Sequence, residues 1–262
     1  MKLKSILALL LALGLLLAGC KSKSEPAASE KPSTVPPKTD AATGETKSEP
    51  AASDKPSTVP SKTDAATDET KAFSMDDVKA EIDSKAVSDF TESSEPTDYV
   101  KLTIADYGEL VLRLRPDVAP ISVENFKGLV AKGYYDGKLF HRVYPGFMIQ
   151  GGSENGDGLP GSEPSIKGEF ASNGVENPLS HVRGVLSMAR ATPPDSGSTQ
   201  FFLMHADYVG LDGNYAAFGY VVAGLDTVDQ VCKVELTYNG SELSKPVTPV
   251  VLTSAVFVTP NQ

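Results

Sequence analysis

Residues 140–152, FHRVYPGFMIQGG, combine chemical groups that a purely structural strand would not need. Arg142 supplies a cation, Gln150 an amide and Met148 a soft apolar surface. Successive side chains of a strand point to opposite faces, so these three residues share one face if the Pro-Gly turn at 145–146 keeps the register. We expect a binding surface there; the alternative is a buried strand that happens to contain an arginine.

Other familiar catalytic chemistries find little support in the chain. Its histidines, His141, His181 and His205, lack the spacing of a metal site, and no HExxH pattern or cysteine pair lies near them. We expect His181 and His205 at the surface or in a supporting role. The glycines at 151–161 are typical of a loop and do not precede a helix, so no phosphate-binding loop is predicted. We therefore expect neither a metal nor a cofactor.

Three blocks of sequence resemble the cyclophilins, the peptidyl-prolyl cis-trans isomerases. The first is FHRVYPGFMIQGG at 140–152; GVLSMARA at 184–191 and STQFFLMHADYVGLDGNYAAFG at 198–219 follow in the family's order. The resemblance covers roughly residues 99–258 and nothing before them. It implies an enzyme that catalyses rotation about X-Pro peptide bonds, with proline-containing polypeptides as its partners.

Prolyl isomerisation breaks no covalent bond, but rotation about the peptide bond has a barrier of about 18–20 kcal/mol. The barrier exists because the nitrogen lone pair is delocalised into the carbonyl. In the twisted transition state the lone pair is localised and can accept a hydrogen bond, so a fixed donor stabilises that state more than either planar one. Arginine stays protonated and can hold two acceptors at once. Arg142 is therefore the predicted catalytic residue, as the resemblance also implies.

The resemblance also assigns residues to substrate binding. An apolar slot for the proline ring is formed by Phe147, Met148, Phe202 and Leu211. The alternative role of these four residues is ordinary core packing. The residues that bind the substrate backbone and orient the arginine are Gln150 and Gln200. The segment that pairs with the residues before proline is Ala189, Arg190 and Ala191, an extended-peptide mode of recognition. Three further residues that contribute to the same site are Phe140, His141 and Tyr215.

Some positions depart from the family's pattern. Arg190 stands where many members have Asn; we expect its side chain to point outward and to favour acidic peptides. Gly210 stands where many eukaryotic members have Trp, and Tyr215 where they often have His. These two departures argue against tight binding of cyclosporin and leave the expected catalytic residues intact.

The N-terminus predicts a lipoprotein. Lys2 and Lys4 precede an apolar run at 6–18 that is too short for a comfortable membrane span, and LAGC at 17–20 resembles a lipobox. Residues 1–19 are therefore a predicted signal peptide, with lipid on the thiol of Cys20 as a membrane anchor. The alternative is ordinary cleavage with an incidental cysteine. Lipidation would make the protein extracytoplasmic and bound to the cell membrane.

Residues 20–72 are predicted to form a disordered tether. The segments 24–47 and 48–71 are near-identical repeats of Ser, Thr, Ala, Pro, Lys and Glu, without an aromatic residue. Such a composition cannot bury enough apolar surface to offset chain entropy. Residues 73–98 are expected to be a linker. The spacing of Phe73, Val78 and Ile82, with Ser74 as N-cap, leaves two alternatives open: a short helix packed on the domain, or a frayed linker end.

Residues 99–262 are predicted to be the folded domain. Alternating apolar residues on both sides of a turn at 106–108 indicate a hairpin. Ser122 is expected to cap a helix that runs to about Lys132. A second helix is expected near Asp226 to Lys233, burying Cys232 as a small core residue. Short strands with two helices favour a capped barrel. The resemblance implies a mainly β fold, a closed eight-stranded antiparallel β-barrel capped by two α-helices.

Charge and motifs together favour an enzyme. The net charge of −10 argues against nucleic acid as a partner, and a monomer is the default. The leading hypothesis is a lipid-anchored isomerase that assists the folding of exported proteins at the cell surface. The second is a non-catalytic chaperone or scaffold that binds proline-containing peptides. A third, for which only the repeats argue, is a surface adhesin.

Overall fold

Eight antiparallel strands form a closed barrel. A computed structural model describes residues 73–262; the predicted signal peptide, Cys20 and the repeats lie outside the described residues. The barrel strands, in spatial order, are β11 (Val251–Pro260), β2 (Tyr99–Ile104), β3 (Gly108–Leu114), β8 (Ala217–Ala223), β6 (Val185–Met188), β7 (Phe201–Met204), β5 (Met148–Gly151) and β4 (Lys138–Tyr144).

The barrel closes where β11 pairs with β4, through Val251 opposite Leu139 and Leu252 opposite Lys138. Closure leaves none of the eight strands as a free edge. The predicted fold class, mainly β with a closed eight-stranded barrel, is confirmed. The predicted hairpin is also present, since β2 and β3 are joined by a turn in which Asp106 has a φ of 66°.

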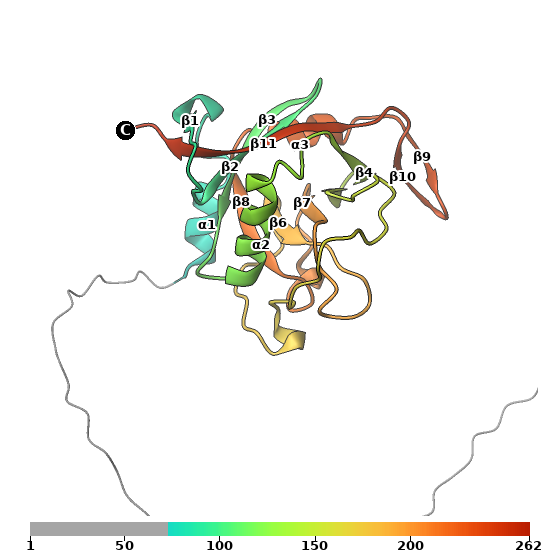
Figure 1. Cartoon of the computed structure of the whole chain (residues 1–262), viewed down its shortest axis with the longest axis horizontal. Coiled ribbons are helices and arrows are strands. Elements are labelled where there is room, and N and C mark those ends of the chain that lie inside the picture. The colour runs from blue at the N-terminus through green and yellow to red at the C-terminus, as the bar shows by residue number, and fades with distance from the viewer. Residues whose placement is uncertain (1–72) are drawn as a thin grey trace, which may run out of the picture. The chain divides into compact units, whose positions relative to one another are not determined.

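The described residues contain three α-helices: α1 (Met75–Glu81), α2 (Pro120–Ala131) and α3 (Asp226–Val231). Helices α2 and α3 lie where the two capping helices were expected, and α1 is the short helix that the sequence left open. Short 3₁₀ turns lie at Val87–Asp89, Ala171–Asn173 and Val209–Leu211. The position of α2 beside the barrel can be followed in Figure 1.

Helix α2 begins at Pro120, so Ser122 does not cap it as expected. Proline suits this position because its missing N–H would have no helical partner. The carboxylate of Glu169 takes over the capping role. It accepts from the backbone N–H groups of Ile121 at 2.9 Å and Ser122 at 2.8 Å. The helix ends before Gly133, whose φ of +64° suits glycine.

Residues 73–98 pack on the barrel and are not a free linker. Ser74 accepts a hydrogen bond from the Asp77 N–H at the start of α1, as expected, and Val78 is 1 % exposed. Glu81 accepts from the Tyr220 hydroxyl at 2.7 Å and also pairs with Arg113. Strand β1 (Phe90–Glu92) then pairs with β11 on the outside of the barrel. The folded unit therefore begins before residue 99.

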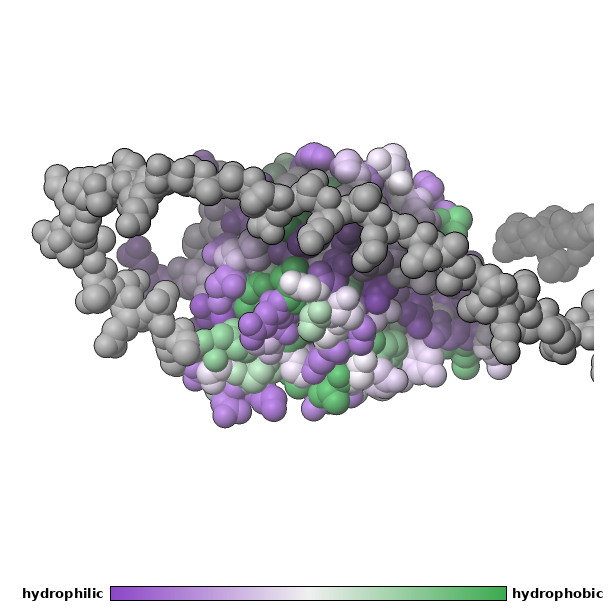
Figure 2. All heavy atoms as spheres, turned by 90° about the horizontal axis from the view of Figure 1, so that it is seen from below, coloured by the Kyte–Doolittle hydropathy of each residue, from purple (hydrophilic) through white to green (hydrophobic). Residues whose placement is uncertain are grey.

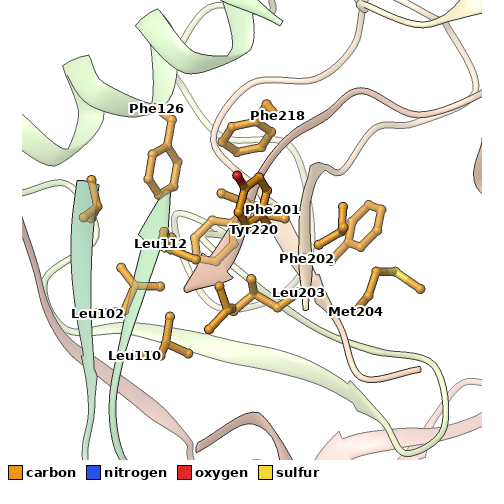
Figure 3. Packing of buried hydrophobic residues seen from close by; sticks show 14 of the residues in the cluster. Leu102, Leu110, Leu112, Phe126, Phe201, Phe202, Leu203, Met204, Phe218 and Tyr220 are labelled. Atoms are coloured by element: carbon orange, nitrogen blue, oxygen red, sulfur yellow. The ribbon is translucent and has the colours of Figure 1, made fainter. Parts of the chain in front are cut away.

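Aromatic rings fill the barrel under α2. The Phe126 ring lies 5.0 Å from Tyr135, 5.4 Å from Phe218 and 5.5 Å from Phe201, measured between ring centroids. Figure 3 shows Phe126 reaching from the helix toward Phe218, with Tyr220 and Phe201 beneath them. Interlocked rings of this size stabilise the barrel beyond the area they bury. They give the strands around the site a rigid support.

A second, two-stranded sheet projects from the barrel. It consists of β9 (Leu236–Asn239) and β10 (Glu242–Pro246), which pair antiparallel. In Figure 1 this hairpin extends beyond the N-terminal end of β11. The side chains of β10 alternate, because Glu242 and Ser244 are shielded while Leu243 and Lys245 are exposed. In β9, by contrast, Thr237, Tyr238 and Asn239 are all exposed. Figure 2 shows one face of the folded part of the chain, on which hydrophobic and hydrophilic residues are interspersed.

The packing of α1 predicts a stability effect. Val78→Ala should lower the free energy of unfolding by about 2 kcal/mol, because it removes two buried methyl groups. Lys79→Ala is the matched control, since Lys79 is the next residue of the helix and is exposed. Urea unfolding of the two variants and the wild type measures the difference. Equal stability of Val78→Ala and Lys79→Ala would contradict the packing of this segment on the barrel.

Candidate active site

A one-residue bulge in β4 sets the direction of Arg142. Opposite β5, Phe140 pairs with Gly151 and Arg142 pairs with Gln150, so His141 is an extra residue between two adjacent partners. A bulge of this kind changes which face the following side chain occupies. Phe140 and Arg142, two residues apart, consequently lie on opposite faces of the barrel wall.

Phe140, which was expected to line the site, lies in the barrel interior. Its side chain is 1 % exposed and packs edge-on against Phe201 at 6.0 Å. Strand alternation alone would put it on the same face as Arg142, and the bulge at His141 is the physical reason that it does not. Phe140 supports the wall from within, while the half-buried Arg142 faces outward.

Arg142 borders a cavity of about 200 Å³ on the outside of the barrel. The residues that line it come from β4, β5, the segment after β6, β7 and the turn before β8. They are Arg142, Phe147, Met148, Gln150, Ala189, Arg190, Phe202, Leu211 and Tyr215. All nine were expected at the site. Met148 and Phe202 are only 1 % and 5 % exposed, so they serve both the barrel wall and the cavity.

A second cavity of about 170 Å³ adjoins the first, because Gln150, Ala189 and Arg190 line both. Its other lining residues include Ala191 and Gln200, which were also expected at the site, and Glu163. The segment 189–191 lies beyond the end of β6, where the Ala191 N–H donates to Ser196 Oγ at 2.9 Å. The two cavities together form an extended groove.

Hydrogen bonds connect the two cavities through Gln150 and Gln200. Arg142 Nη1 donates to Gln150 Oε1 at 3.3 Å, and Gln150 Nε2 donates to Gln200 Oε1 at 3.0 Å. Gln200 Nε2 then donates to the carbonyl oxygens of Gly158 at 3.2 Å and Leu159 at 3.0 Å. These amide hydrogen bonds connect one side of the Arg142 guanidinium to the loop that contains Gly158 and Leu159.

Glu242 is a neighbour of Arg142 that the sequence did not indicate. Its Oε2 accepts from Arg142 Nε and its Oε1 from Arg142 Nη2, both at 2.7 Å. The guanidinium hydrogen bonds hold the pKa of the Glu242 carboxyl below its usual range. The two residues are 100 positions apart in the chain. The Asn-Gly pair at 239–240 is a hairpin signal that could have located the segment, but not its partner.

Arg190 does not point outward as expected. Its guanidinium lies over the rings of Tyr215 at 4.7 Å and Phe170 at 5.1 Å. Its Nε donates to the Asn214 carbonyl at 2.9 Å and its Nη1 to the Ala191 carbonyl at 2.9 Å. These contacts make Arg190 a fixed wall between the two cavities, with Tyr215 stacked on it.

His181 supports the proline-sized cavity from behind. The ring is 0 % exposed and stacks on Phe202, with centroids 6.0 Å apart and planes 20° apart. Its Nδ1 lies 2.8 Å from Asp212 Oδ1 and its Nε2 2.9 Å from Ser187 Oγ. Burial lowers the pKa of His181, which favours a neutral ring that donates to Asp212 and accepts from Ser187.

The other two histidines occupy different places. His141 lies beside Gly158 and lines neither cavity, although the resemblance placed it at the site. Burial lowers the pKa of its imidazole. His205 accepts a hydrogen bond from the Gly146 N–H at 2.8 Å through Nδ1 and so fixes the turn between β4 and β5.

Residues 73–262 contain neither a cluster of metal ligands nor a helix that could cross a membrane. In that range, no group of three or more His, Cys, Asp or Glu side chains could hold a metal ion. No helix there has the length and hydrophobicity that crossing a bilayer requires. Cys232 is a buried free thiol, and burial raises its pKa to about 12, which makes it a poor nucleophile.

The comparisons with known proteins agree on one family. The family described as "Cyclophilin type peptidyl-prolyl cis-trans isomerase/CLD" matches residues 99–256. Peptidyl-prolyl cis-trans isomerase A of Dickeya dadantii is 40 % identical over 157 residues, which are 58 % of this chain and 80 % of that protein. An Acinetobacter baylyi peptidyl-prolyl cis-trans isomerase is 40 % identical over 153 residues, 56 % of this chain and 79 % of the relative.

A solved structure carries the same fold. The crystal structure of a cyclophilin-type isomerase of Cryptosporidium parvum, determined in the presence of the dipeptide Ala-Pro, matches with a TM-score of 0.53 and 29 % sequence identity. The match covers 60 % of this chain and 97 % of that one. With the eight-stranded barrel, the groove beside Arg142 and the match over 99–256, the chain belongs to the cyclophilin-type peptidyl-prolyl cis-trans isomerases.

Proposed function

We propose that the groove beside Arg142 is the active site of this isomerase, and that the enzyme assists the folding of exported proteins while anchored to the membrane by lipid. One observation carries the assignment of the active site: a guanidinium with two N–H groups not used by Glu242 or Gln150 borders a cavity of about 200 Å³ that has an apolar side. A cavity of this size suits a proline ring with its neighbouring peptide groups.

In the proposed complex the proline ring occupies the slot formed by Phe147, Met148, Phe202 and Leu211. The X-Pro bond then lies near Arg142. An N–H of the guanidinium donates to the proline nitrogen as its lone pair localises, and no such bond forms in the planar states. The donor is fixed before the substrate arrives, so little reorganisation is needed in the transition state.

Residues before the proline occupy the second cavity in this proposal. Ala189, Ala191 and Gln200 all line this cavity. An extended peptide can use main-chain hydrogen bonds along such a groove. The related structure determined with Ala-Pro supports proline-containing peptides as the ligands. The substrate preference for acidic residues, expected from an outward Arg190, is not retained, since that guanidinium is held by carbonyls and rings.

Removing the guanidinium tests the catalytic assignment. Arg142→Ala should lower kcat/KM in a protease-coupled assay on an Ala-Pro peptide by about 100-fold or more, the usual effect of losing one transition-state donor. Arg183→Ala is the matched control. Arg183 forms a comparable two-point ion pair with Asp229, at similar exposure, and lines neither cavity.

The outcomes of that assay are distinct. A loss confined to Arg142→Ala supports catalysis by the guanidinium. Equal activity of Arg142→Ala and wild type would contradict it. A wild-type chain that binds Ala-Pro peptides without accelerating their isomerisation would favour the non-catalytic chaperone or scaffold.

The proposed anchor rests on the sequence of residues 1–20, MKLKSILALLLALGLLLAGC. Cys20→Ala should move the protein from the membrane pellet to the soluble fraction, because a lipid contributes about 0.8 kcal/mol of membrane affinity per buried methylene. Ser24→Ala serves as the control for a nearby change. Fractionation of producing cells, with incorporation of labelled palmitate, measures both effects. Equal pelleting of Cys20→Ala and wild type, without label in either, would contradict lipidation.

A further inference from the structure

We propose that Glu242 is a positioning residue for catalysis, which holds the guanidinium of Arg142 in its working orientation. The proposal rests on the function proposed for Arg142. Glu242 reaches the guanidinium from β10, a strand of the separate hairpin, and lines neither cavity of the groove. Its expected contact is therefore with the arginine and not with the substrate.

The contacts use one edge of the guanidinium and leave the other side available. A guanidinium has five N–H groups. Glu242 accepts one from Nε and one from Nη2, and Gln150 accepts one from Nη1. One N–H on Nη1 and one on Nη2 have no hydrogen-bond partner among residues 73–262. These two can meet a peptide at the cavity that Arg142 lines without breaking the pair with Glu242.

The two-point geometry explains why a carboxylate suits this position. A carboxylate that accepts from both Nε and Nη2 fixes the plane of the guanidinium as well as its place. Gln150 alone, at 3.3 Å from Nη1, would leave the plane free to turn about the side chain. Arginine loses considerable conformational entropy when its side chain is fixed. Because Glu242 fixes Arg142 before the substrate binds, this loss does not add to the activation free energy.

The hairpin in turn fixes Glu242. Ser244 Oγ donates to Glu242 Oε2 at 2.8 Å, and Ser244 is 0 % exposed. Strand β10 has a register shift between Leu243 and Lys245, so the hydrogen bond from the buried Ser244, and not regular alternation, holds the carboxylate in place. A chain of hydrogen bonds therefore runs from Ser244 through Glu242 and Arg142 to Gln150 and Gln200.

The ion pair is suited to positioning more than to stability. The side chains of Arg142 and Glu242 are 30 % and 31 % exposed, and ion pairs at such exposure contribute little to folding. Loss of Glu242 should therefore change turnover while the thermal midpoint changes little. A purely structural residue would show the reverse pattern, with a lower midpoint and unchanged kinetic constants.

The test measures kcat and KM separately for isomerisation of an Ala-Pro peptide by the full chain. Glu242→Ala should lower kcat about tenfold with little change in KM, and Glu242→Gln should lower it less, because an amide keeps one acceptor; a misplaced group of about 1 Å can cost up to about 100-fold. Asp229→Asn is the control, since Asp229 forms the comparable pair with Arg183 away from the groove, and its kcat should stay within about twofold of wild type.

A double variant separates positioning from a general effect. In the Arg142→Ala background, Glu242→Ala should cause no further loss of kcat, because the group it positions is gone. An unchanged or raised kcat in both single variants of Glu242 would overturn the proposal, and a rise would mean that the carboxylate competes with substrate. An additive loss in the double variant would also overturn it. An inactive wild type would instead refute the proposed function itself, so the two failures are distinguishable.

Discussion

The extra residue in β4 is the constraint on which the site depends. A regular strand would place Arg142 on the same face as Phe140, inside a barrel filled with aromatic rings. The bulge at His141 turns Phe140 inward and Arg142 outward, opposite Gln150. Burying an unpaired guanidinium among Phe201 and its neighbours would be very costly. The register of one strand pair thus reconciles a packed interior with a cation on the outer wall.

The barrel and the segments packed on it then determine the surroundings of the Arg142 guanidinium. Met148 and Phe202 belong to β5 and β7, in which every residue except Gln150 is buried, so the apolar side of the cavity is continuous with the core. His181 supports Phe202 from behind, between Asp212 and Ser187. The polar side comes from more distant segments. The hairpin β9–β10 and the amides of Gln150 and Gln200 approach the guanidinium from two directions.

The sequence predicted those features that are encoded locally. Alternation on both sides of residues 106–108 predicted the β2–β3 hairpin, and the motif at 140–152 brought Arg142, Met148 and Gln150 together. Features that depend on pairing between distant segments were missed. Phe140 was expected at the site from the resemblance, and nothing in the local sequence reveals the bulge that turns it inward. Ser122 was misjudged as a helix cap because the capping carboxylate, Glu169, comes from another part of the chain.

The same reason applies to the contacts of the site. Nothing in the local sequence of β10 distinguishes Glu242 from a solvated acid, and only the folded structure brings it to Arg142. Arg190 was expected to extend into solvent because the rings of Phe170 and Tyr215, which hold it, are distant in sequence. Composition did indicate a boundary near residue 73. It left open whether a helix there packs on the domain, and it did not predict the pairing of β1 with β11.

The central claim is that the guanidinium of Arg142 is already fixed when a proline-containing peptide binds. The most direct measurement is a crystal structure of the chain with an Ala-Pro peptide. We expect the proline ring among Phe147, Met148, Phe202 and Leu211. An N–H of Arg142 should lie about 3 Å from a peptide acceptor, with both hydrogen bonds to Glu242 retained. An arginine that leaves Glu242 to reach the peptide, or a proline ring outside this cavity, would contradict the account.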